Sequence, residues 1–223
     1  MKSEKKVLVV ASGGLDSTVL LWMCVKEHEK VGVLTFNYGS NHNEMEHKCL
    51  EKTCLALGVP LHTIMLDFMK TSFKSSLLGQ GDIPEGNYDE MSMKNTVVPF
   101  RNGILLAIAA GYAESNGYDI IALGNHAGDH TIYPDCRPEF IRSMGDAIKS
   151  GTWNGVDILS PFCDITKAQI VEVGKKIGVD FSTTYSCYKG GERHCGKCGT
   201  CRERIEAFQL AGVEDPTIYE DKN

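Results

Sequence analysis

The sequence predicts a protein of the α/β class, built on a doubly wound parallel sheet and followed by a small cysteine-rich helical tail. The runs 6–11 (KVLVVA) and 31–36 (VGVLTF) are continuously apolar and rich in valine, as strands covered on both faces are. Segments with apolar residues at helical spacing alternate with such runs, which is typical of a parallel sheet with helices on both faces. From residue 182 onward this alternation stops and cysteines accumulate.

The remaining elements follow in the same alternation. A segment with helical spacing over 15–27 connects the first two strands, and a second helix over 43–57 ends before the turn GVP. A long connection rich in glycine and polar residues covers about 79–95. The further expected elements are a strand at 61–66, a helix at 101–116 stopped by Gly117, a strand at 119–124, a helix at 138–149, a strand at 156–160, and helices at 166–177 and 201–211.

Composition limits the class of function. Of the 223 residues, 42% are hydrophobic and 23% are charged, as expected of one globular domain with a small appendage. The net charge is −6, and no block rich in lysine or arginine occurs outside CRERIE at 201–206, which argues against a nucleic acid as the main substrate. No stretch approaches the roughly 18 to 20 apolar residues of a membrane span, so we expect a cytoplasmic protein without an export signal.

The segment 11–19, ASGGLDSTV, joins the first strand to the first helix and lies at the edge of the sheet where ligands bind. Gly13 and Gly14 have no Cβ, so the backbone can approach an anion closely. The helix N-terminus adds converging N–H donors and about half a positive charge. Hydroxyl donors at the same place come from Ser12, Ser17 and Thr18. The segment therefore indicates a phosphate-binding loop; the alternative is a glycine-serine turn that only caps the helix.

Asp16 is the exception in this loop. A carboxylate beside a phosphate repels it unless a cation lies between them, so we interpret Asp16 as a partner of Mg²⁺ or as a helix cap. The loop also lacks the lysine of the G-x-x-x-x-G-K-[ST] motif and does not match G-x-G-x-x-G.

Four cysteines of the tail, Cys187, Cys195, Cys198 and Cys201, have the spacing C-x7-C-x2-C-x2-C. Zn²⁺ takes about four thiolate ligands in a tetrahedron, and two C-x-x-C steps present neighbouring sulfurs to one ion. Disulfides compete with this interpretation, but cytosolic thiols stay reduced. An iron–sulfur cluster also competes, although the fourth cysteine lies upstream and no C-P follows. The spacing favours structural zinc; His194 could replace a ligand, although four thiols already suffice. Ordinary buried thiols are expected at Cys24, Cys49, Cys54, Cys136 and Cys163.

The motif SGGLDST at 12–18 resembles the pyrophosphate-binding loop of the N-type ATP pyrophosphatases, or PP-loop enzymes. This resemblance implies a Rossmann-like fold and a reaction in which ATP adenylates a carboxylate or amide oxygen and pyrophosphate departs. The segment PFCDITKAQIVEVG at 161–174 is similar to a second anion-binding segment of that family, which makes Lys167 the cation that the loop lacks. The alternative for Lys167 is a solvated side chain after a helix cap at Asp164 or Thr166. The resemblance implies ATP contacts at Ala11, Ser12, Gly13, Gly14, Leu15, Asp16, Ser17, Thr18, Val19, Leu20, Leu21 and Gly124.

Three further segments resemble one branch of these enzymes, the 7-cyano-7-deazaguanine synthases of queuosine biosynthesis. They are VVPFRNG at 97–103, GNHAGDHTIYPDCRPEF at 124–140 and the tail through AFQLAGVEDPTIY at 207–219. The resemblance implies an ATP- and Mg²⁺-dependent carbon–nitrogen ligase that converts 7-carboxy-7-deazaguanine and ammonia to the nitrile through two adenylates. It also implies a nucleotide-binding domain at 1–181, a Zn²⁺-binding tail at 182–223 packed on the same core, and a cytoplasmic homodimer with neither nucleic acid nor membrane as a direct partner.

Arg101 opens a helix after a glycine-rich connection, where a bidentate contact to a phosphate or to the substrate carboxylate is expected. The alternative is an arginine paired with a surface acid, which is disfavoured because cations are unfavourable at a helix N-terminus. The segment 133–139 alternates acceptors, donors and a ring, as recognition of a planar guanine-like base needs; a turn built by Pro134 and Pro138 is the alternative. The expected catalytic residues are Asp16, Arg101 and Lys167, and the expected substrate contacts are Arg101, Tyr133, Asp135, Arg137, Glu139 and Tyr185.

Two segments depart from the common pattern of that branch. The chain reads YGSNH at 38–42 where many members have YGQRH, so it lacks an arginine there. The segment NHAGDHTI at 125–132 departs from a commoner form that contains TDFSGY. We therefore assign no chemical role to His42, Asp129 or His130 from sequence.

Two other functions remain open at this stage. One is a related amide-forming or tRNA-modifying adenylating enzyme, of which a tRNA-thiolating type would need an RNA-binding surface that the negative net charge disfavours. The other is a zinc-stabilised nucleotide-binding module that acts through a partner. The separate signals at Arg101 and Lys167 favour catalysis over binding alone.

Overall fold

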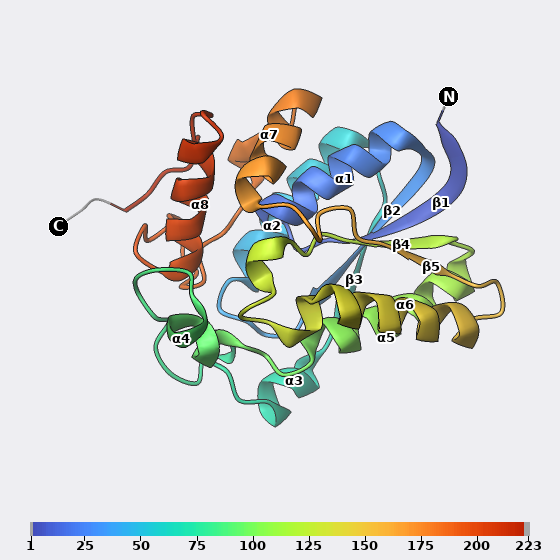
Figure 1. The fold of residues 1–223 in the computed structure, drawn as a ribbon, viewed down its shortest axis with the longest axis horizontal. Coiled ribbons are helices and arrows are strands. Elements are labelled where there is room, and N and C mark those ends of the chain that lie inside the picture. The colour runs from blue at the N-terminus through green and yellow to red at the C-terminus, as the bar shows by residue number, and fades with distance from the viewer. Residues whose placement is uncertain (1, 221–223) are drawn as a thin grey trace.

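The computed structural model describes residues 2–220, and its centre is one sheet of five strands in the order β3-β2-β1-β4-β5 (Figure 1). Every neighbouring pair of strands is parallel. This confirms the predicted doubly wound α/β sheet. The strands are β1 (Ser3–Val10), β2 (His28–Asn37), β3 (Leu61–Met65), β4 (Ile120–Leu123) and β5 (Asp157–Leu159).

Helices cover both faces of the sheet (Figure 1). One face carries α1 (Leu15–Glu27), α2 (Asn43–Leu57), α7 (Lys167–Ile177) and α8 (Gly199–Leu210). The other face carries α5 (Arg101–Asn116) and α6 (Pro138–Gly151). The short helices α3 (Asp67–Ser72) and α4 (Glu90–Met93) lie in the connection between β3 and α5.

Strand β1 runs through the middle of the sheet and separates two hydrophobic cores. Val7 and Val9 pack in the core formed with α1 and α7, whereas Leu8 and Val10 pack in the core formed with α5 and α6. All four side chains are buried, because successive residues of a strand point to opposite faces and both faces are covered. This double burial explains why the segment reads as a continuous apolar run.

Local sequence sets the ends of the helices. Helices α1, α2 and α5 begin and end at the residues predicted from helical spacing. Helix α7 begins with a capping box in which Thr166 accepts a hydrogen bond from the backbone of Gln169, whose side chain bonds back to Thr166. The prediction was wrong in extent for β2, which starts at His28 because its pairing with β1 continues back to Ser3.

The sheet places a ligand site between β1 and β4. These neighbouring strands flank the point where the strand order reverses, and in open α/β sheets ligands bind in the crevice beyond the carboxyl ends of such strands. The connections after the two strands approach each other closely. A Cβ added at Gly124, just after β4, would lie 3.3 Å from the backbone of Asp16 in the loop after β1.

The C-terminal segment folds back onto the same body. Helix α8 packs against α7, and Ala207 and Phe208 belong to the core that also contains α1 (Figure 1). The segment after α8 returns to the tail, where His194 and Ile218 are joined by a backbone hydrogen bond. Within residues 2–220, no single helix is long and apolar enough to cross a bilayer. The bent helix pair 90–96 and 101–116 reaches the length and apolar composition of a span only when its two parts are taken together.

Candidate active site

One cavity of about 200 Å³ lies at the carboxyl ends of β1 and β4. The loop after β1 forms one side of it. The other sides are formed by α5, α2, the start of α7, the connections before α4 and after β4, and the cysteine-rich tail. The predicted site residues that line the cavity are Ala11, Ser12, Gly14, Leu15, Asp16, Ser17, Arg101, Gly124, Tyr133, Lys167 and Tyr185. The fold therefore brings the predicted phosphate loop and all three expected catalytic residues to one place.

Some residues of the predicted ATP-binding run do not line this cavity. Gly13 turns its backbone toward α2, and Thr18 is fully buried behind the loop. The side chains that follow along α1 belong to the hydrophobic core, namely Val19, Leu20 and Leu21. Only the first part of the predicted run thus faces the space where a ligand can bind.

The shape of the loop is fixed by its own hydrogen bonds. The backbone N–H of Gly14 donates to Ser12 Oγ at 3.1 Å, and the N–H of Ser12 donates to Ser17 Oγ at 3.2 Å. The N–H of Tyr185 donates to the carbonyl oxygen of Gly13 at 3.0 Å, which ties the tail to the loop. The loop conformation therefore depends on a segment of the tail far away in sequence.

Lys167 is the cation at this end of the cavity. Its Nζ lies 2.5 Å from Glu203 Oε2 and 3.4 Å from Asp16 Oδ2, and its side chain is 14% exposed. Burial alone would lower the pKa of Lys167, but the carboxylates of Asp16, Glu203 and Asp129 raise it well above its usual value. Lys167 is therefore positively charged and fixed in place by its carboxylate partners. It follows the helix cap at Thr166, but its side chain is buried, so the alternative of a solvated lysine does not hold.

Glu203 is a member of this cluster that sequence reasoning missed. It comes from α8, two residues after Cys201, and its side chain is 13% exposed. His126 lies among the same acids, with Nε2 3.5 Å from Asp129, 3.7 Å from Glu203 and 3.9 Å from Asp16. The Oδ1 atom of Asp16 is buried and has no hydrogen-bond partner among the described residues, as a carboxylate oxygen available to a cation would be.

Arg101, at the start of α5, also lines the cavity. Its Nη1 donates to Tyr38 Oη at 3.2 Å, and no carboxylate within residues 2–220 lies at ion-pair distance from it. The alternative of an arginine paired with a surface acid is therefore not what the structure has. The guanidinium remains available for an anionic group in the cavity.

Tyrosines form much of the remaining wall, and we call Tyr88, Tyr133, Tyr185 and Tyr188 the aromatic wall. The hydroxyls of Tyr133 and Tyr188 lie 3.4 Å apart, and Tyr88 donates to Asp129 at 2.9 Å. Burial raises the pKa of each of these phenols, so they stay protonated. Flat rings with hydroxyl donors suit a planar, polar ring system.

The other residues predicted from the segment 133–139 lie outside the cavity lining. Asp135 is buried, and its Oδ2 accepts a hydrogen bond from the N–H of Asn102 at 2.7 Å, which holds the start of α5 next to Arg101. Arg137 Nε donates to the carbonyl oxygen of His130 at 2.9 Å, and Glu139 is exposed in the first turn of α6. Of the substrate contacts predicted in this segment, only Tyr133 lines the cavity, together with Cys136, for which no contact was predicted. The prolines begin the helical turns, as the structural alternative expected.

A buried pair on α2 was also missed. The N-cap residue His42 lies with Nε2 3.6 Å from Oε2 of Glu46, and Oε1 of Glu46 accepts a hydrogen bond from Ser12 Oγ at 3.1 Å. The ring of His42 stacks on Tyr188 with centroids 4.9 Å apart. Both residues line the cavity. The departure of 38–42 from the common motif meant that no role was predicted for His42, and Glu46 looked like an ordinary acid on a helix.

The tail brings Cys187, Cys195, Cys198 and Cys201 together. All four are buried, and their Sγ atoms lie within 4.8 Å of one another. A tetrahedral zinc site with Zn–S bonds of about 2.3 Å needs sulfurs about 3.8 Å apart, so these thiols fit such an ion after small adjustments. His194 Nε2 instead accepts a hydrogen bond from the N–H of Ser186 at 2.9 Å. We call the segment 187–201 the cysteine knuckle.

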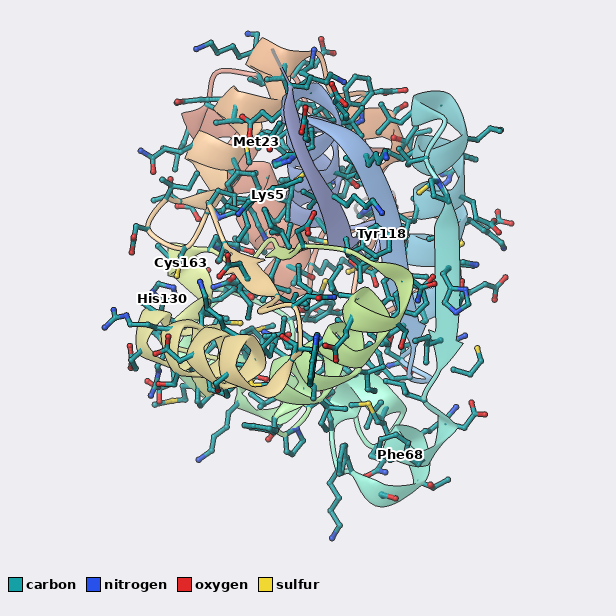
Figure 2. The ribbon with its side chains drawn as sticks, turned by 90° about the vertical axis from the view of Figure 1, so that its right-hand side faces the viewer. Lys5, Met23, Phe68, Tyr118, His130 and Cys163 are labelled. Atoms are coloured by element: carbon teal, nitrogen blue, oxygen red, sulfur yellow. The ribbon has the colours of Figure 1, made fainter. Side chains whose placement is uncertain are left out.

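The scattered cysteines are free thiols in the structure. Three are buried as predicted, namely Cys24, Cys54 and Cys136, but Cys49 and Cys163 are half-buried, so the prediction was wrong for these two. Cys163 Sγ lies 3.7 Å from Nε2 of His130, and Figure 2 shows the two side by side. Neither residue lines the cavity.

Comparisons with known proteins identify the family of the chain. The sequence profile of the family described as "Queuosine biosynthesis protein QueC" matches residues 6–212. A 7-cyano-7-deazaguanine synthase of Porphyromonas gingivalis is 53% identical, with 99% of this chain and 100% of the relative covered. Proteins of the same name from Desulfotalea psychrophila and Methanoregula boonei are 47% and 44% identical, covering 95% and 96% of this chain and 97% and 99% of their own lengths.

A solved structure supports the fold independently. The NMN synthetase of Francisella tularensis superposes with a TM-score of 0.51 over 95% of this chain and 79% of that chain. Its sequence identity is 15%, so the likeness concerns the fold alone.

Proposed function

The chain belongs to the QueC family of queuosine biosynthesis proteins, and from this premise we propose that it is an ATP-dependent ligase that makes 7-cyano-7-deazaguanine from 7-carboxy-7-deazaguanine and ammonia. Relatives that match it over nearly their whole length carry the name of that synthase. The acid is activated twice. Its carboxylate oxygen attacks the α-phosphorus of ATP and expels pyrophosphate, and ammonia then displaces AMP to give the amide. The amide oxygen is adenylated in turn, and loss of AMP and two protons leaves the nitrile.

One observation carries the proposal: the phosphate loop and Lys167 lie in the same cavity as Arg101 and the aromatic wall. The loop and Lys167 are suited to a triphosphate end, since they offer converging backbone donors and a held cation. Arg101 is suited to the carboxylate of the acid, and the aromatic wall to its ring. Adenylation requires these two ligands side by side, which a single shared cavity provides.

Two metals fit the residues present. Asp16, with an unpartnered Oδ1, would hold the Mg²⁺ that accompanies ATP, and that ion would neutralise charge on the phosphates. The cysteine knuckle would hold Zn²⁺ through four thiolates, which leaves no open position and makes a structural role the natural one. The order of neighbouring segments would then depend on the ion. The N–H of Gly86 donates to the carbonyl oxygen of Lys197 in the knuckle, and α8 begins at Gly199 within it.

The proposal is tested by product analysis. The purified protein with ATP, Mg²⁺, ammonium and 7-carboxy-7-deazaguanine is expected to yield AMP, pyrophosphate and a product lighter than the amide by one water in a mass spectrum. When the carboxylate carries labelled oxygen, the label is expected in AMP. If neither amide nor nitrile appears and no label reaches AMP, the substrate assignment is wrong.

Two variants separate the halves of the site. Lys167→Met is expected to lower the rate of adenylation by about two orders of magnitude, because it removes charge stabilisation from the departing pyrophosphate. Arg101→Met is expected to weaken capture of the acid more than that of ATP. The variant Lys48→Met is a matched control, since Lys48 pairs with Glu44 on the exposed face of α2 and should leave the rate unchanged.

A further inference from the structure

The cavity contains a buried acid that the proposed reaction does not use. Glu46 lies in the first turn of α2, and its side chain is 12% exposed. Its Oε1 accepts the hydrogen bond from Ser12 Oγ, and a Cβ added at Gly14 would lie 3.4 Å from the same oxygen. The carboxyl group of Glu46 is therefore in contact with the loop that we propose to hold pyrophosphate.

No cationic side chain neutralises this carboxyl group at close range. Within residues 2–220, His42 is its one neighbour at ion-pair distance. Burial and the charge of Arg101 lower the pKa of His42 to about 3, so its ring is neutral at physiological pH. The segment 38–47 contains no lysine or arginine. An ionised Glu46 would thus face a phosphate group with no cationic side chain at ion-pair distance to offset it, which is unfavourable.

The protonation of Glu46 is easily changed. Burial raises the pKa of Glu46 to about 7, against the lowering effects of the hydrogen bond from Ser12 and the charge of Arg101 on α5. The other titratable group close to it on α2 is Cys49, whose thiol pKa is raised by burial, so Cys49 is neutral in this range. Neither neutral His42 nor Cys49 therefore competes with Glu46 for a proton near pH 7.

We propose that Glu46 is a proton-linked contact of the phosphate site: pyrophosphate, free or as the end of ATP, binds the loop with Glu46 protonated, and a proton is taken from solvent when the carboxylate was ionised beforehand. The neutral acid no longer needs the hydroxyl of Ser12 as a donor, so this hydroxyl is free to turn toward the phosphate. Release of pyrophosphate returns the proton to solvent and the Ser12 hydroxyl to Glu46. This inference rests on the proposed function of the loop.

Calorimetry tests the proposal through the number of protons bound. Pyrophosphate with Mg²⁺ is titrated into the metal-loaded full chain at about pH 6 and about pH 8, each in two buffers with different ionisation enthalpies, and the difference in heat gives the proton uptake. Pyrophosphate titrates by itself, so the quantity compared is the uptake by the natural chain minus that by Glu46→Gln. The matched control is Glu44→Gln, because Glu44 lies on the exposed side of the same helix turn and pairs with Lys48.

The expected result is close to one extra proton at about pH 8 for the natural chain and for Glu44→Gln, and almost none at about pH 6. The affinity of the natural chain should fall by up to about tenfold per pH unit above neutrality relative to Glu46→Gln, which should bind at least as tightly. Equal proton uptake and equal pH dependence in the natural chain and Glu46→Gln would overturn the inference while leaving the loop as the phosphate site. If pyrophosphate and ATP bind none of these proteins, the proposed function of the loop is wrong as well. If Glu46→Gln does not fold, the titration of pyrophosphate with Mg²⁺ alone in the same buffers is subtracted instead, and a corrected uptake no larger at about pH 8 than at about pH 6 overturns the inference.

Discussion

At the scale of single residues, Gly13 sets the shape of the loop after β1, which we propose to hold phosphate. Its φ of 99° lies in the region that side chains disfavour, and an added Cβ would lie 2.0 Å from the carbonyl oxygen of Glu46. That oxygen belongs to the backbone of α2 and cannot rotate away as a flexible side chain can. The loop and α2 are therefore packed so closely that only glycine fits between them.

We expect Gly13→Ala to lower the free energy of unfolding by about 1–3 kcal/mol and to weaken pyrophosphate binding by more than tenfold, because the loop must move away from α2. Urea unfolding and calorimetry measure the two effects. The control is Gly111→Ala within α5, where an added Cβ meets nothing within 4 Å and the change should slightly stabilise the helix. Pyrophosphate affinity that survives Gly13→Ala intact would show that the loop does not hold this ligand.

Several residues of the site could not be found from the sequence for a physical reason. Lys167 stands behind a recognisable helix cap, and the loop at 11–19 joins a strand to a helix, so local patterns identify both. Glu46 and Glu203 look like ordinary helix-surface acids in the sequence. Their burial against Ser12 and Lys167 arises only when helices distant in the chain pack together.

At the scale of elements, a buried arginine of α8 binds the segment that follows this helix. Arg204 is fully buried, and its guanidinium donates to Thr184 at 2.7 Å and pairs with Asp215 at 3.1 Å. Burial alone would raise the pKa of Asp215, but the charge of Arg204 and hydrogen bonds from Arg204, Tyr219 and Thr217 more than offset it and lower this pKa. This pair holds the segment after α8 against the tail.

We expect Asp215→Asn to lower the free energy of unfolding by about 3 kcal/mol, because it leaves a buried guanidinium without its counter-charge. The depressed pKa of Asp215 means that its contribution is present above its unfolded value of about 4 and is lost as the pH falls below it. Urea unfolding at neutral and acid pH should therefore show a difference between the two proteins that shrinks in acid. The exposed pair of Lys149 and Asp157 is the control, and Asp157→Asn should have no comparable effect.

Most helices and strands could be predicted because their patterns are local. Apolar spacing located α1, α2 and α5 to the residue, and the run of β1 was readable because both its faces are covered. The connection at 79–95 was less readable. It contains α4, capped by Asp89, and its position is set by pairing of Glu85 with Cys198 in the tail, which no local pattern reveals.

At the scale of the whole molecule, the cysteine knuckle connects parts of the chain that form different walls of the cavity. The first residues of α8 belong to it, and Glu203 of α8 contacts Lys167. Its Cys198 forms a β-bridge with Glu85, in the connection that contains Tyr88. The segment just before it supplies Tyr185, whose N–H bonds to Gly13. Order in the knuckle is thus required for both halves of the proposed site.

We expect Cys198→Ser to lose bound zinc and, with it, most ATP-dependent activity, although Cys198 does not line the cavity. Elemental analysis of the purified protein and the melting temperature with and without a chelator measure the effect. The control is Cys24→Ala, which removes a buried thiol of the core and should cost some stability but no metal. A chelated natural chain that melts at the same temperature as the untreated one would mean that the ion is not structural.

The position of the aromatic wall in the chain has a consequence for the proposed function. Tyr88, Tyr133, Tyr185 and Tyr188 all lie in connections outside the strands and α-helices, whereas the phosphate loop is anchored directly to β1 and α1. Under the proposed function, exchanging those connections would change the acid that is bound while the proposed phosphate loop stays in place. The proposed recognition of the acid would then be separable from the sheet, because none of the four tyrosines belongs to a strand or an α-helix.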